Sequence, residues 1–246
     1  MVTYFFWGKI LPERAQLDLN LNKTFKALDI ELEGEVIISI ILNQVLVTVK
    51  VLKEEDIFLL KRIVNSLLDS EMSKLAFIRG FSYSAVIDRC LKEDGAEDWV
   101  YGIDYPLDKS VHTVAAINEM LNWMQPLSAG VEGVLIERCL NDFKSALTHL
   151  DDAPFYCYRA IETLRNHCSD IHGISKAPET RSAQWQTFRD AIGITKEEIG
   201  YFTQWATELR HGHVTCMSGE DEFNVLNKTH SILHSYFHYL REKKGL

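Results

Sequence analysis

The stretch whose residue types could do chemistry most directly is Leu209–His213, which places one arginine and two histidines within four residues. Arg210 carries a permanently charged, planar guanidinium that can hold a phosphate through two hydrogen bonds. His211 and His213 carry imidazoles that titrate near neutral pH. Together they suit metal-independent RNA cleavage, in which a histidine deprotonates the ribose 2′-hydroxyl and the arginine stabilises charge on phosphorus. The alternative is an ordinary helix C-terminus, where Arg, His and Gly are all favourable.

A second polar set lies on the preceding stretch of chain. Glu162 precedes Arg165 by three residues, so the two side chains share one face of a helix. Arg165 and His172 are separated by six residues and form a possible catalytic Arg/His pair. An intrahelical series of salt bridges followed by a polar loop is the alternative interpretation.

Three further histidines, His230, His234 and His238, recur at a spacing of four. This spacing on a helix brings adjacent pairs within reach of one metal ion. No acidic residue or cysteine stands at ligand spacing beside them, so we interpret them as residues at the edge of a buried helix face. We expect no metal and no cofactor.

The second half of the chain has the 3.6-residue period of helices, and short connections between them predict a bundle of antiparallel neighbours. The segment before Gly173 begins with Asp151 or Asp152 as the N-cap. The next-to-last helix begins with the capping box Thr195–Glu198. The predicted helices are Val111–Met124, Glu132–Leu150, about 152–172, Thr180–Ile192, about 196–210 and Glu220–Arg241.

The first half alternates like a sheet. Val36–Leu42 is nearly continuously apolar, which predicts a strand covered on both faces. Asn43–Gln44 then interrupts it before Val45–Val51 resumes the alternation, which predicts a hairpin. Other predicted elements are the strand Thr3–Trp7, a helix over Glu54–Asp69, and strands within Leu75–Leu91 and Trp99–Tyr105.

These patterns predict an α+β protein with two domains divided at Pro106. Residues 1–105 form a β-rich α+β domain, in which we find no phosphate loop, metal-ligand cluster or nucleophile motif. Residues 106–246 form an all-α helical bundle.

Composition limits the classes of function. With a net charge of -9 and 46% hydrophobic residues, the chain fits a globular protein that binds nucleic acid only through a local basic patch. It has no apolar stretch long enough for a membrane helix, and Met1–Trp7 makes a poor signal peptide. Five scattered cysteines without a C-x-x-C pair predict reduced thiols and a cytoplasmic location: Cys90, Cys139, Cys157, Cys168 and Cys216.

Residues 150–242 resemble HEPN domains (the higher eukaryote and prokaryote nucleotide-binding group), particularly the ApeA-like and abortive-infection branches. The segments that carry the resemblance are Tyr158–Leu164 and Glu208–His213. The resemblance implies a helical bundle, often dimeric, with a composite site at the dimer interface. Many such domains are metal-independent endoribonucleases in toxin, phage-defence or stress systems, and others only bind or assemble.

The HEPN motif is an arginine, a polar residue, and a histidine after four to six intervening residues, often followed by glycine. The late segment departs from it, because His211 adjoins Arg210 and only two residues precede His213. The spacing does match at Arg165–Gly173, which contains the polar Asn166 next to the arginine and His172 before the glycine. Either the late motif has lost catalysis or the earlier one serves.

We therefore carry two main hypotheses, and a lesser third in which His230, His234 and His238 serve a metal enzyme. In the first, a HEPN-like protein binds RNA or a nucleotide and cleaves RNA: Arg210 holds phosphate, His211 or His213 acts as base or acid, and Glu162 orients one of them. In the second, a non-catalytic protein uses its helical half to dimerise or to dock a protein partner, which the acidic balance favours. Both allow a homo-oligomer, and neither involves a membrane.

Overall fold

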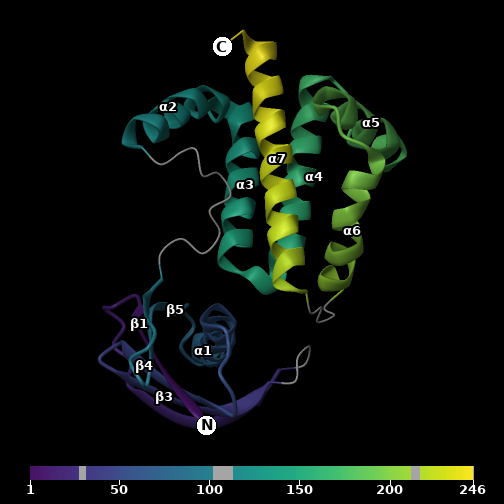
Figure 1. Cartoon of the computed structure of the whole chain (residues 1–246). Helices are drawn as coiled ribbons and strands as arrows, with labels where there is room; N and C mark the ends of the chain where they lie inside the picture. The colour runs from purple at the N-terminus through teal and green to yellow at the C-terminus, as the bar shows by residue number, and fades with distance from the viewer. Residues whose placement is uncertain (28–31, 102–112, 212–216, 246) are drawn as a thin grey trace. The chain divides into compact units, whose positions relative to one another are not determined.

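The computed structural model describes residues 1–27, 32–101, 113–211 and 217–245. The chain divides into two compact units, Met1–Asp104 and Tyr105–Leu246 (Figure 1). The first holds an antiparallel sheet and the second is helical, so the predicted α+β class with a helical C-terminal part is confirmed. The boundary predicted at Pro106 lies outside the described residues.

Within the described part of the first unit, six strands form one antiparallel sheet in the order β2-β3-β4-β1-β5-β6. Their bounds are β1 Val2–Leu11, β2 Leu19–Lys26, β3 Glu33–Ile41, β4 Gln44–Val51, β5 Ser84–Lys92 and β6 Asp98–Val100. Neighbouring strands in the middle of the sheet bury alternate residues in one core, as period-2 sequences should.

The β3–β4 hairpin turns at Leu42 and Asn43, one residue earlier than the predicted Asn43–Gln44. Both turn residues have positive φ, 49° and 66°, the backbone that suits a tight two-residue hairpin. Asn43 is only 2% exposed. Its side chain accepts a hydrogen bond from the Leu17 N–H at 2.5 Å and donates one to the Ile10 carbonyl at 3.2 Å, so it ties three segments together.

Strand β3 is covered on one face, and the prediction of two covered faces is wrong. Val36, Ile38 and Ile40 are buried, whereas Ile41 is 66% exposed. The run is nearly continuously apolar because two outward positions, Ile37 and Ile41, also carry β-branched residues, which favour strands whether or not they are buried.

Helix α1, Ile57–Arg79, covers the buried side of the sheet (Figure 1). Asp56 caps its start by accepting hydrogen bonds from two backbone N–H groups at 2.9 Å. The helix continues ten residues past the predicted end at Asp69, until Gly80 takes a left-handed φ of 71°. The strand predicted over Leu75–Leu91 is therefore wrong in its first part.

The second unit is a helical bundle built around α4. Its helices are α2 Val114–Met124, α3 Gly130–Thr148, α4 Ala153–Ile171, α5 Arg181–Ile192, α6 Lys196–Arg210 and α7 Gly219–Lys244. Helix α4 packs against α3, α5, α6 and α7 (Figure 1). Of its 19 residues, eleven are buried, so α4 is the element whose polar residues other helices must accommodate.

The predicted helix starts are largely confirmed. Thr195 and Glu198 form the predicted capping box at the start of α6. Asp152 precedes α4, but its side chain makes no capping hydrogen bond. Helix α2 buries none of its residues, and its apolar Val114, Ile117 and Leu121 are exposed.

The four described cysteines, Cys90, Cys139, Cys157 and Cys168, are all buried free thiols. Burial raises the pKa of Cys90 to about 11 and that of Cys157 to about 12. Cys216 lies outside the described residues. Within the described ranges, no helix is both long and apolar enough to cross a membrane.

Candidate functional site

Arg210 is the last residue of α6, and His211 caps the helix end. Both side chains are exposed. The His211 N–H bonds to the carbonyls of Thr207 and Glu208 at 3.2 and 3.1 Å, so these residues do occupy a helix C-terminus. His213 lies outside the described residues.

Glu162 links two arginines from different helices. Its Oε1 atom lies 3.5 Å from Nη1 of Arg165 on the same helix and 3.3 Å from Nη2 of Arg181 at the start of α5. The first contact is the one predicted from spacing. Arg181 was not predicted, because only the packing of α5 on α4 brings it to Glu162.

Arg165 is 7% exposed, so it is the buried one of the two arginines that contact Glu162. Its guanidinium stands over the Trp185 ring at 4.8 Å from the centroid, and its Nη2 donates to Asn166 Oδ1 at 2.8 Å. Among the described residues, its Nε and Nη1 have no hydrogen-bond partner, although Nη1 is the atom in the ion pair with Glu162. Burial lowers the pKa of Arg165, and the Glu162 carboxylate opposes that effect.

Tyr158 lies one helical turn before Glu162, and the charges around it affect its titration. Burial raises the pKa of this phenol, Glu162 raises it further, and the charges of Arg165, Arg181 and Arg210 all lower it. The Tyr158 ring stacks on Trp185 with centroids 6.2 Å apart and planes 20° apart.

We call Arg165, Arg181 and Arg210, together with Glu162, the arginine cluster. Arg165 and Arg181 both contact the Glu162 carboxylate and the charge of Arg210 acts on the same Tyr158 phenol, so positive charge exceeds negative charge within this group of four residues. Such a local excess attracts anions even where the whole protein is acidic.

His172 lies outside the arginine cluster, at the C-cap of α4. Its Nε2 atom is 2.7 Å from the Tyr239 hydroxyl and 3.2 Å from Lys243 Nζ, both on α7. Lys243 Nζ also lies 3.4 Å from the Tyr239 hydroxyl. We call these three residues the His172 triad. Arg165, seven residues earlier and about 10 Å away along the helix, finds its partners on α4 and α5, so the predicted Arg165–His172 pair shares a helix without direct contact.

The protonation of His172 follows from its neighbours. Burial lowers the pKa of His172, and the Lys243 charge lowers it further. Because the Lys243 ammonium has no acceptor lone pair, it can only donate towards Nε2. Both effects favour the neutral form of the imidazole over the charged form.

Comparison with known families identifies both halves of the chain. Residues 4–101 match the N-terminal domain, and residues 121–241 match the C-terminal domain, of one family described as "Domain of unknown function (DUF8168)". The chain belongs to this family. No curated protein and no solved structure matches it.

The C-terminal family domain contains the arginine cluster, His172 and Tyr239, and its match ends two residues before Lys243. Arg181, Tyr239 and Lys243 were missed by sequence reasoning. Tyr239 and Lys243 do show one signal, a spacing of four on a helix. Their pairing with His172 depends on how α7 packs against α4, which no local pattern contains.

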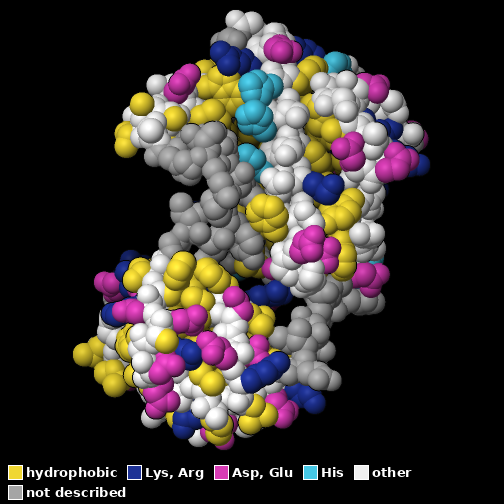
Figure 2. Space-filling view, viewed as in Figure 1, with side chains coloured by type: hydrophobic (Ala, Val, Ile, Leu, Met, Phe, Trp, Pro, Cys, Tyr) yellow, Lys and Arg dark blue, Asp and Glu magenta, His cyan; other side chains and the backbone are white. Residues whose placement is uncertain are grey.

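His230, His234 and His238 lie on α7, where Figure 2 shows histidines gathered. The ring centroids of His230 and His234 are 6.3 Å apart, and those of His234 and His238 are 4.4 Å apart. Trp123 lies 5.0 Å from His238. Among the described residues, no group of three or more His, Cys, Asp or Glu is arranged to hold a metal ion.

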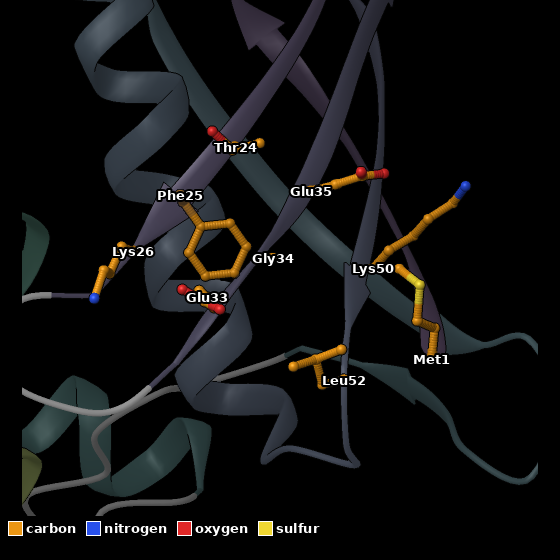
Figure 3. A pocket seen from close by; sticks show the side chains of 9 residues that line it. All are labelled: Met1, Thr24, Phe25, Lys26, Glu33, Gly34, Glu35, Lys50 and Leu52. Carbon is orange, nitrogen blue, oxygen red and sulfur yellow. The ribbon is translucent and has the colours of Figure 1, made fainter.

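The N-terminal family domain carries an open depression of about 550 Å³ at the ends of β2, β3 and β4 (Figure 3). Lys26 and Lys50 line it together with Glu33 and Glu35, so opposite charges balance. Phe25 lies beside Gly34, where a Cβ atom would come within 2.9 Å of the ring. The depression lacks the charge excess of the arginine cluster.

Proposed function

We propose that the C-terminal domain binds RNA or a nucleotide in a HEPN-like manner, with the arginine cluster as its phosphate site. The observation that carries the proposal is that Arg165 and Arg181, from two helices, contact one carboxylate, while the charge of Arg210, from a third helix, acts with theirs on the Tyr158 phenol. Arginine is the side chain best matched to phosphate, because its guanidinium offers two parallel N–H donors.

The arginines of the cluster differ in exposure, and we assign them different roles accordingly. Arg181 and Arg210 are exposed and reach a bound phosphate directly. Arg165 is buried, so it adds positive charge from beneath and holds Glu162 in place. The partly exposed rings of Tyr158 and Trp185 provide apolar surface on which a base can stack.

The proposal includes a biological setting that follows from the HEPN resemblance. The protein would act in the cytoplasm as a homo-oligomer, in a phage-defence, toxin or stress system. Cleavage of RNA is a separate step. It requires a base and an acid, whereas the arginine cluster supplies only charge; His211 adjoins Arg210 in the sequence, and His213 follows two residues later.

Binding is tested by fluorescence anisotropy with a labelled single-stranded RNA over a range of salt concentrations. We expect Arg181→Ala to weaken binding and to reduce the salt dependence by about 0.7 in log–log slope, as loss of one phosphate contact does. Arg189→Ala is the matched control, because Arg189 lies on the same helix and bonds to Gln186. Competition by a nucleoside monophosphate distinguishes a nucleotide ligand from RNA.

The predicted late motif is tested in the same assay. The variant with Arg210, His211 and His213 all replaced by alanine should bind RNA more weakly than the parent while melting at the same temperature. Arg210 and His211 are exposed, so their loss costs little stability. Unchanged affinity in this variant and in Arg181→Ala would refute the phosphate site.

A second candidate function, assembly through the helical domain, is favoured by α2. Its Val114, Ile117 and Leu121 are exposed at helical spacing. Glu119 is the one charged residue on this helix, so two copies can meet there with little like-charge repulsion. We therefore name a second copy of the chain as the partner.

This candidate is tested by light scattering on the purified protein. An oligomer that Ile117→Glu and Leu121→Glu convert to monomer would support it. Val134→Glu is a control for a general effect of added charge, since Val134 is exposed on α3. A monomeric parent would refute assembly through α2.

A further inference from the structure

We propose that two copies of this chain associate through the N-terminal sheet, with the side of the sheet opposite α1 as the interface. We call this side the open face. The proposal concerns the N-terminal unit alone and is independent of the RNA binding and of the α2 contact considered above. It is carried by an apolar patch with balanced charges at the centre of the open face.

The strand register brings apolar side chains together on the open face. Side chains alternate between the two sides of a strand, so those of β1 that alternate with the buried core point away from α1. Strand pairing sets Trp7 directly opposite Leu46 on β4, and Phe5 directly opposite Leu91 on β5. The Phe5 and Trp7 rings lie 6.1 Å apart. These four residues form a continuous apolar centre.

Neighbouring strands extend this centre. Ile37 on β3 stands opposite Thr48 on β4, which stands opposite Phe5 on its other side. Four apolar residues of the open face are well exposed: Leu46 (37%), Val86 (39%), Ile41 (66%) and Val100 (71%). Exposed apolar residues are ordinary when they are scattered singly, whereas a contiguous patch marks an interaction surface.

The cations beside this centre have acidic neighbours. Arg89 stands over the Trp7 ring at 5.7 Å from the centroid, and its Nε and Nη2 donate to Asp98 at 2.8 and 2.6 Å. Lys50 stands directly opposite Glu35 on β3. Such balanced charges offer little to a nucleic-acid backbone or to an anionic membrane. Aromatic side chains and arginine at the centre, with lysine and glutamate towards the rim, are typical of a contact between proteins.

The size of the open face is sufficient for a specific contact. Its four long central strands, β3, β4, β1 and β5, each contain eight to ten residues. At a spacing of about 4.8 Å between strands and about 3.3 Å between residues, they cover about 500 Å². Two copies would therefore bury about 1,000 Å² in total, which is the size at which a specific interface becomes stable.

The open face is complementary to itself. A two-fold axis parallel to the strands, between β4 and β1, sets Leu46 against Trp7 of the partner subunit. The same axis sets Arg89 against Ser39 of the partner subunit, so this cation meets an uncharged side chain. Aligned sheets cross at about 30°, so the pairing applies near the axis. Because apolar centre meets apolar centre there without like charges, we name a second copy as the occupant.

The test measures the molar mass of the full chain by light scattering over a range of concentrations. We expect the parent to dimerise, and Leu46→Glu and Ile41→Glu each to raise the dissociation constant at least about tenfold, because each buries an unpaired carboxylate. Ile78→Glu is the matched control, since Ile78 is 73% exposed on α1 and lies outside the open face. It should associate as the parent does.

Cross-linking tests the same contact without weakening it. Leu46→Cys places a thiol beside the proposed axis, whereas the four native cysteines that the structure describes are buried. A short bismaleimide should link two copies of Leu46→Cys. The parent and Ile78→Cys, treated in the same way, should run as monomers on a denaturing gel. Equal cross-linking of all three proteins would contradict the proposed interface.

Two further outcomes would overturn the proposal. One is a parent that stays monomeric at high concentration. The other is a dimer that Leu46→Glu and Ile41→Glu leave intact while Ile117→Glu and Leu121→Glu dissociate it, because assembly would then use α2. RNA binding by the open-face variants should equal that of the parent, so failure of this interface and failure of the proposed RNA binding are observed separately.

Discussion

The Nδ1 atom of His167 lies 2.8 Å from the hydroxyl oxygen of Tyr236, although 69 residues separate them in the chain. His167 is 1% exposed, and burial lowers its pKa. Its Nε2 has no hydrogen-bond partner in the part of the chain that the structure describes. The helical core therefore favours the neutral imidazole. At low pH this imidazole is protonated either in its apolar surroundings or after the domain has unfolded.

We predict that stability falls as the solution is acidified. The folded-state pKa of His167 is below its unfolded value of about 6.5, so the unfolded chain binds the proton more tightly. The contribution to stability is complete above pH 6.5 and is lost as pH falls from there through the folded-state pKa. Melting temperatures between pH 7.5 and pH 5 measure it. His167→Gln should flatten the curve, although His172, whose pKa is also lowered, leaves some slope.

The two arginines that hold Glu162 should differ in their effect on stability. Arg165 is buried over Trp185, so Arg165→Ala removes packing and should lower the free energy of unfolding by about 1–3 kcal/mol. Arg181 is exposed, and Arg181→Ala should change it by less than about 0.5 kcal/mol. Urea unfolding of both variants decides this. Equal losses would contradict the assigned difference in burial.

Asn43 should be sensitive to substitution for two separable reasons. Asn43→Ala removes the side-chain bonds to Leu17 and Ile10 and puts alanine, which tolerates a left-handed φ less well than asparagine does, at a φ of 66°, so we expect a loss of about 2–4 kcal/mol. Asn43→Gly keeps the favourable backbone and should lose about 1–2 kcal/mol less. Thermal unfolding of the pair measures the difference, and identical stabilities would show that the backbone angle contributes little.

The charge of Lys243 should be visible in the titration of His172. Lys243→Met removes a cation that lowers the pKa of His172, so that pKa should rise towards its ordinary value while the effect of burial remains. Proton NMR of the His172 ring as a function of pH reports this directly, without relying on activity. Lys244→Met should leave the titration where it is in the parent. An equal rise of the His172 pKa in Lys243→Met and Lys244→Met would mean that the net charge of the protein, and not the contact with Lys243, sets this pKa.

Local signals were sufficient to predict many element boundaries. Thr195 and Glu198 define the start of α6 because the capping box needs only four neighbouring residues. The extent of α1 was missed, because residues beyond Asp69 are compatible with helix or strand and Gly80 is the first strong stop. The apolar run of β3 predicted a second covered face, since composition alone does not show what lies across a strand.

The site was predictable where its residues are neighbours in sequence and not elsewhere. Spacing placed Glu162 beside Arg165 correctly. Arg181 and the partners of His172 come from helices that reach α4 only through tertiary packing. The Arg165–His172 pair matched a motif spacing, yet each residue faces different neighbours. Spacing along one helix determines on which side of that helix a side chain lies. The packing of neighbouring helices determines which groups that side chain contacts.

The buried cysteines can report the unfolding of the unit in which each of them lies. A thiol reacts with alkylating reagents only as an accessible thiolate, and burial with a raised pKa suppresses both conditions. Cys90 lies in the N-terminal unit, and Cys139, Cys157 and Cys168 lie in the helical one. The rate of labelling at each position therefore measures how often that unit unfolds. The unfolding of the two units can thus be measured separately in one sample of the unmodified protein.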